Sequence, residues 1–157
     1  MGIKLKIIII LILCTGKVYS CENYIFNKIA EGDIVSVKRY LSNGGNPNLA
    51  RIEDVNNCVY ETRKCSADTL ISMALLSGEI DIAIELVKFG ADFNNNSRSL
   101  ISPIEIAIEL DQLKFIKYLL DEKLVQINDY INDEKFLDIA TSLGGKKISA
   151  YVKSLIP

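Results

Sequence analysis

The 157-residue sequence contains no histidine and no tryptophan, and neither sign of charge is in large excess. The absence of histidine excludes the Ser-His-Asp and Cys-His nucleophile systems, the common imidazole-bearing zinc sites and histidine-based pH switching. With 18 Lys and Arg against 20 Asp and Glu, the net charge of −2 gives no basic footprint for nucleic acid. What is present is a 49% hydrophobic chain whose length fits one modest domain.

The apolar run near the amino terminus is too short to cross a bilayer. Lys4 and Lys6 precede an unbroken apolar octet, Ile7–Cys14, and Lys17 closes it with a charge. A membrane-spanning helix needs roughly 20 apolar residues. A basic start followed by a short apolar run is typical of a secretory signal peptide. We therefore predict that residues 1–20 are a signal peptide and that residues 21–157 form the mature domain.

Two ways of processing this segment stay open. Val-Tyr-Ser-Cys at residues 18–21 resembles a bacterial lipobox, whose cysteine becomes the lipidated amino terminus. Lys17 and the bulky Tyr19 depart from that pattern, so the alternative is simple cleavage after Ser20. A retained membrane anchor is a third, weaker reading. Either cleavage predicts an exported protein, which we place in a bacterial periplasm and whose contact with the membrane would be through lipidation of Cys21.

The body of the chain repeats with a fixed period. Alignment on Gly32, Gly78, Asp111 and Gly144 gives spacings of 46, 33 and 33 residues. Apolar residues follow each anchor at helical spacing, on one side of each expected helix. Such short helices are not stable alone, so each helix pair must stack on the next. A period of 33 favours a repeat architecture over a single globule.

Two short motifs carry a resemblance to a known family. Residues 88–94, Lys-Phe-Gly-Ala-Asp-Phe-Asn, are a close match to the run that ends each ankyrin unit. Residues 69–74 and 102–107 match the Thr-Pro-Leu-His-x-Ala opening, with Ser72 and Glu105 in place of the histidine. The sequence therefore resembles the ankyrin-repeat family.

That resemblance implies an all-α ankyrin-repeat solenoid of about four helix-turn-helix units. We expect the first and last units to be degenerate caps, because one face of each meets water. Lys28 stands where the motif has a small residue, Lys123 replaces the turn glycine, and the last unit lacks the Thr-Pro opening. The expected units are about 23–48, 69–94, 102–128 and 133–156.

One connection is longer than the repeat allows. The first spacing exceeds 33 by 13 residues, and the excess falls in an insertion at about 49–68, which forms one long finger loop. Long connections in compact domains are usually functional or disordered. Aromatic and arginine side chains carry most interface energy. We therefore predict that partner-binding residues lie in this insertion and in the tip of the next finger, namely Arg51, Asp54, Tyr60, Glu61, Arg63, Asn94 and Arg98.

No catalytic constellation accompanies the repeats. Asp81 with Glu85, and Glu105 with Glu109, are carboxylates at helical spacing, without a histidine, a phosphate loop or a metal cluster beside them. We predict a monomer that is not an enzyme, uses no cofactor or metal, and binds no nucleic acid. The family implies a single protein partner held against the fingers and inner helices. The expected role is an inhibitor or immunity protein that neutralises a toxin or effector; the alternative is an envelope scaffold or stress-associated protein that protects a periplasmic enzyme.

Export predicts a disulfide between Cys58 and Cys65, which would brace the insertion. An oxidising compartment keeps such a bridge closed, and the small loop restricts the unfolded chain by about 2 to 3 kcal/mol. Two free or buried thiols are the alternative, and a metal site is less expected because no CxxC is present. Mass spectrometry of exported material should find Cys58 joined to Cys65. Free thiols, or a bridge from Cys21 to either cysteine, would contradict this prediction.

Overall fold

The computed structural model describes residues 24–51, 69–94, 101–131 and 134–156. Within them the helices come in pairs joined by tight turns. The pairs are residues 24–30 with α2 (Ile34–Ser42), α3 (Leu70–Leu76) with α4 (Ile80–Lys88), α5 (Pro103–Glu109) with α6 (Leu113–Asp121), and α7 (Phe136–Ser142) with α8 (Lys146–Ser154). The predicted fold class, an all-α ankyrin-like repeat fold, is confirmed.

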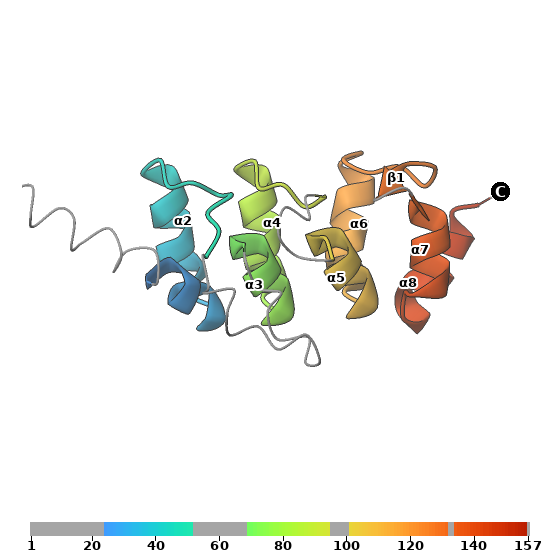
Figure 1. The fold of residues 1–157 in the computed structure, drawn as a ribbon, viewed down its shortest axis with the longest axis horizontal. Helices are drawn as coiled ribbons and strands as arrows, with labels where there is room; N and C mark the ends of the chain where they lie inside the picture. The colour runs from blue at the N-terminus through green and yellow to red at the C-terminus, as the bar shows by residue number, and fades with distance from the viewer. Residues whose placement is uncertain (1–23, 52–68, 95–100, 132–133, 157) are drawn as a thin grey trace, which may run out of the picture.

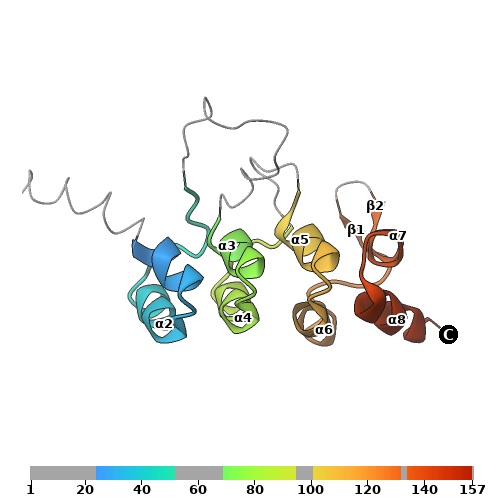
Figure 2. The same ribbon diagram turned by 90° about the horizontal axis from the view of Figure 1, so that it is seen from below.

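The helices form two layers along an elongated stack (Figure 1). Figure 2 shows α3, α5 and α7 in one row and α2, α4, α6 and α8 in another. Each helix contacts the next one in its own row, as α3 does α5 and α4 does α6. We call these rows the first layer, which includes residues 24–30, and the second layer. Since α3, α5 and α7 begin 33 residues apart, successive pairs present equivalent faces to one another.

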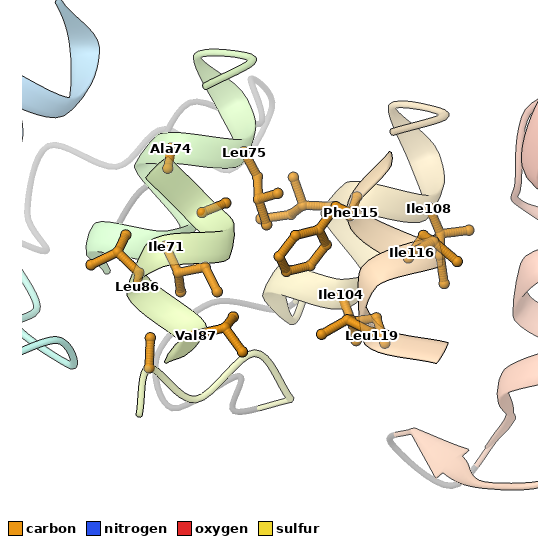
Figure 3. Packing of buried hydrophobic residues seen from close by; sticks show 14 of the residues in the cluster. Ile71, Ala74, Leu75, Leu86, Val87, Ile104, Ile108, Phe115, Ile116 and Leu119 are labelled. Carbon is orange, nitrogen blue, oxygen red and sulfur yellow. The ribbon is translucent and has the colours of Figure 1, made fainter. Parts of the chain in front are cut away.

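One continuous apolar core joins all four pairs. Figure 3 shows the contact between the second and third pairs, where the fully buried Phe115 lies between Leu75 and Ile104. Phe26 and Phe136 are buried to the same degree in the first and last pairs. Burying one such side chain contributes about 1.5 to 3 kcal/mol. First-layer helices of seven residues are too short to be stable alone, so this shared core stabilises them.

Side-chain caps begin the first-layer helices where the sequence provides them. The Thr69 hydroxyl accepts a hydrogen bond from the backbone N–H of Ser72 (3.2 Å). At α5, the Ser102 backbone N–H donates to the Glu105 carboxylate (2.7 Å), which completes a capping box with Pro103 at the first helical position. The Glu105 carboxylate therefore has a structural role at the start of α5.

Two turn positions that are glycine in the earlier units carry side chains in the third. Asp111 and Lys123 have φ values of +53° and +57°, in the left-handed region that ordinary residues resist. Asp111 also caps the neighbouring unit, because its carboxylate accepts from the backbone N–H of Ile148 (2.9 Å) and of Lys147 (3.3 Å). The N-cap of α8 is Gly145, and a Cβ at this position would overlap the Asp111 side chain. Asp111 thus supplies from another unit the cap that α8 lacks.

Replacing Lys123 and Asp111 by glycine, one at a time, separates two contributions to stability: the strain of a positive φ and the cap that Asp111 provides for α8. We expect Lys123→Gly to raise the free energy of unfolding by about 1 kcal/mol, because glycine adopts a positive φ without steric cost. Asp111→Gly relieves the same strain but removes a cap worth about 1 kcal/mol, so it should give no net gain. Urea denaturation of both variants measures the difference. An equal gain in both would show that the Asp111 carboxylate does not stabilise α8.

Candidate functional site

A finger is the loop that joins a second-layer helix to the first-layer helix of the next pair, and the first, second and third fingers follow α2, α4 and α6. Each finger returns to the first layer through one recurring backbone contact. The Leu70 N–H donates to the Leu49 carbonyl (3.2 Å), and the Ile104 N–H donates to the Phe93 carbonyl (2.9 Å). In the third finger, the Phe136 N–H donates to the Asp129 backbone carbonyl (2.8 Å). This bond lies next to the hairpin of β1 (Tyr130–Ile131) and β2 (Glu134–Lys135). Figure 2 shows this hairpin beside α7, on the first-layer side.

Asn48 ties the first finger to the second. Its side-chain amide donates to the Gly90 carbonyl (3.0 Å), and its amide oxygen accepts from the Asp92 N–H (2.7 Å). The Asp92 carboxylate in turn accepts from the Asn94 N–H (2.9 Å). These bonds hold the described parts of the two fingers in one arrangement, which reduces the conformational entropy lost when a partner docks.

A groove of about 260 Å³, which we call the finger groove, lies between the second and third fingers. Its lining residues are Phe93, Asn94, Ile104, Leu124, Val125, Asp129, Tyr130 and Ile131. Tyr130 is 63% exposed and Leu124 is 44% exposed at its edge. A groove with an apolar wall, a polar edge and an accessible tyrosine is suited to accept the side chains of a protein partner.

The structure places two of the residues predicted to bind a partner, and they lie in different surroundings. Asn94 is exposed and lines the finger groove beside the hairpin. The Arg51 guanidinium lies 4.6 Å from the centroid of the Phe26 ring, so this side chain packs back against the first helix pair. The other predicted residues lie outside the described residues, namely Asp54, Tyr60, Glu61, Arg63, Arg98, Cys21, Cys58 and Cys65.

Sequence reasoning missed Tyr130 and Leu124. The sequence offers one weak signal for Tyr130, because it is an aromatic residue in an expected finger and aromatic residues are enriched at interfaces. The sequence instead predicts the interface in the insertion and the second finger. Nothing in the local pattern around Tyr130 predicts that it lines the same groove as Asn94, because the two residues belong to different units and only stacking brings their fingers together.

Two side chains of the first helix pair, Lys28 and Asp33, have shifted pKa values, and both lie away from the finger groove. The hydrogen bond from Lys28 to the Glu31 carboxylate (2.6 Å) raises the pKa of Lys28. Hydrogen bonds from the backbone N–H and the hydroxyl of Ser36 lower the pKa of Asp33, the N-cap of α2. Both shifts belong to groups that hold a turn and a helix start, so they indicate structural roles.

The described residues contain neither a candidate metal-ligand cluster nor a candidate membrane span. Within residues 24–51, 69–94, 101–131 and 134–156, no three Cys, Asp or Glu side chains are grouped so that they could hold a metal ion. The helices of the same ranges are all too short or too polar to span a bilayer.

The fold and the finger groove define a repeat scaffold, and comparison with known proteins agrees with that class. No protein-family model matches the chain. The chain is 30% identical over 129 residues, 77% of its length, to "Putative ankyrin repeat protein FPV222" of Fowlpox virus (strain NVSL). It spans only 16% of the length of that protein. The similarity supports the ankyrin-repeat family.

The bridge made by Asn48 can be tested at the amide that it protects. Asn48→Ala removes the acceptor of the Asp92 N–H, a bond worth about 1 kcal/mol. We expect the Asp92 amide to exchange with solvent about fivefold faster in hydrogen-exchange NMR. Asn43→Ala, which changes an exposed asparagine at the end of α2, is the matched control and should leave that rate unchanged. Unaltered exchange in the Asn48 variant would mean that the two fingers are held together by other contacts.

Proposed function

We propose that this protein binds one protein partner through the finger groove and the adjoining first-layer helices. The observation that carries the proposal is the groove lined by two exposed apolar side chains of the third finger, Tyr130 on the hairpin and Leu124 just after α6. A backbone hydrogen bond from Phe136, the first residue of α7, to the Asp129 carbonyl holds the start of the hairpin beside α7. A rigid aromatic side chain gives large contact area at low cost in conformational entropy. Tyr130 is therefore the anchor, and Asn94 contributes polar contacts at the edge of the groove.

The charge around this groove favours a basic partner surface. Among the described residues, the second finger (89–94), the third finger from residue 124 to 135, α5 and α7 carry six carboxylates and one lysine, Lys135. The carboxylates are Asp92, Glu105, Glu109, Asp129, Glu134 and Asp138. Charges at the edge of an interface mainly increase the association rate and exclude partners of like charge. A partner with a basic rim and an apolar centre is the best fit.

The insertion extends the same surface in this proposal. Ala50 and Thr69, which flank it, pair as an antiparallel bridge, so both ends of the insertion start from the first finger. Its residues Asp54, Tyr60, Glu61 and Arg63 then supply additional contacts to the partner.

The proposed setting is outside the cytoplasm, and it rests on the signal-peptide pattern of residues 1–20. In a bacterial periplasm, the proposed action is inhibition of a toxin or effector by occlusion of its surface. Protection of a periplasmic enzyme is the alternative action through the same groove. An activity assay of the captured partner separates them, because an inhibitor lowers that activity and a protective scaffold preserves it.

The anchor role of Tyr130 has a matched control on the opposite layer. Tyr130 and Val35 are 63% and 64% exposed, and Val35 lies on α2 in the second layer. We expect Tyr130→Ala to weaken binding of the partner recovered by affinity capture by about 2 kcal/mol, about 30-fold in Kd. Val35→Ala should leave Kd unchanged in the same calorimetric titration. Full affinity in a folded Tyr130→Ala variant would move the interface away from this groove.

A further inference from the structure

Charge in the described residues is divided between the two layers. The second-layer helices carry eight basic residues and three acidic ones, the reverse of the balance around the finger groove. The basic residues are Lys38, Arg39, Lys88, Lys114, Lys117, Lys146, Lys147 and Lys153, and the acidic residues are Asp81, Glu85 and Asp121. The second layer is therefore a basic face on a protein whose net charge is −2.

Ion pairs between units remove most of the acidic charge from this face. Lys114 contacts Asp81 (2.5 Å), and Glu85 lies 3.4 Å from Lys38 and 3.6 Å from Lys88. Further along the stack, the Lys117 ammonium lies 4.7 Å from the centroid of the Tyr151 ring. Within the described residues, Lys117, Lys146, Lys147 and Lys153 form no ion pair with a carboxylate. Apart from Arg39 on α2, the unpaired positive charge of this face therefore lies over α6 and α8.

A groove of about 750 Å³ runs along α6 on this face. Ile84, Leu113 and Tyr118 give it apolar contact area. Lys114 and Lys117 lie near the start of α6, whereas Asp121 and Glu122 lie at its end. Asp111 also lines the groove near Lys114, where its carboxylate is engaged by the backbone N–H groups of Lys147 and Ile148. Lys147, in the first turn of α8, adds a third ammonium at the same end as Lys114.

We propose that this groove is a second protein-binding site, which takes an acidic segment of a partner. The carboxylates of that segment contact Lys117 and Lys147, which form no ion pair within the described residues, and an apolar side chain next to them packs on Leu113 and Tyr118. The order of charge fixes the direction of the segment, since Asp121 repels its acidic end. This site goes beyond the single interface proposed above: it is separate from the finger groove, so an acidic segment can bind here while the finger groove holds its own partner.

The lining favours a protein over nucleic acid or a lipid surface. Asp121 and Glu122 at one end repel a continuous row of phosphates, whereas a protein segment varies in charge along its length. The described lining contains no arginine, the residue best suited to bidentate phosphate contacts. It also lacks the large exposed apolar side chains with which an amphipathic surface enters a bilayer.

A labelled peptide tests the site directly on the full chain. The probe is a fluorescein-labelled ten-residue peptide that contains five Glu, two Leu and one Phe. A peptide of about this size is long enough to follow the length of α6. Fluorescence anisotropy measures its Kd, and the same peptide with Lys in place of Glu is the charge control. Backbone NMR then maps the contact, and we expect the largest shifts at the amides of residues 113–121 and 146–149.

Charge reversal identifies the residues that bind the peptide. We expect Lys117→Glu with Lys147→Glu to weaken binding about tenfold. The matched control, Arg39→Glu with Lys135→Glu, makes the same change in net charge away from the groove and should retain affinity. If the first variant loses its thermal transition, Lys117→Gln with Lys147→Gln replaces it, with a smaller loss expected.

Several results would overturn the proposal. These are no binding of the acidic peptide, an equal loss in both double variants, or shifts confined to the fingers. Tighter binding of a single-stranded oligonucleotide or of phosphatidylserine vesicles than of the peptide would assign the face to a phosphate-bearing partner instead. Tyr130→Ala should bind the peptide normally, so failure of the finger groove as an interface is distinguishable from failure of this second site.

Discussion

The contact between neighbouring helix pairs is the interaction on which the rest of the molecule depends. First-layer helices of seven residues and second-layer helices of nine cannot be stable in isolation, so folding requires that each pair bury its apolar side against the next. The fully buried Phe115, between residues of the second and third pairs, is the clearest instance. Stacking places fingers beside fingers and second-layer helices beside one another, and both grooves exist only as a result.

Polar contacts between units fix how the pairs stack, because dispersion and apolar burial have little directional preference. At the turn end, the Gln112 side chain donates to the Leu75 carbonyl (2.6 Å), and Asp111 caps α8 of the following unit. At the finger end, Asn48 bonds to Gly90 and Asp92 of the following unit. Each contact connects residues 36 to 44 positions apart, close to one repeat, so a shift of one unit against its neighbour would break it.

The division of charge between the layers gives the two faces different capacities. The acidic surface around Tyr130 suits a partner with a basic rim, and the basic surface around Lys117 suits an acidic segment, so each surface would disfavour the partner proposed for the other. Ion pairs such as Lys114 with Asp81 lie on the surface and contribute little stability, but they leave the remaining lysines as the net charge of the second layer. A chain of nearly balanced composition can therefore present two selective surfaces, which its net charge of −2 does not reveal.

The sequence by itself determined the all-α repeat architecture, because helix periodicity, turn residues and caps such as Ser102 are local signals that recur every 33 residues. It also pointed to Asn94 as a surface residue of the second finger. The tertiary structure alone decided that Glu105 closes a capping box, that Arg51 lies on Phe26, and that Asn94 shares a groove with Tyr130. Arg51 and Phe26 lie 25 positions apart, and Asn94 and Tyr130 belong to different units, so a local pattern carries no information on which of these side chains lie close together. Which atoms a side chain contacts is set by packing and register, and these form only when the units fold against each other.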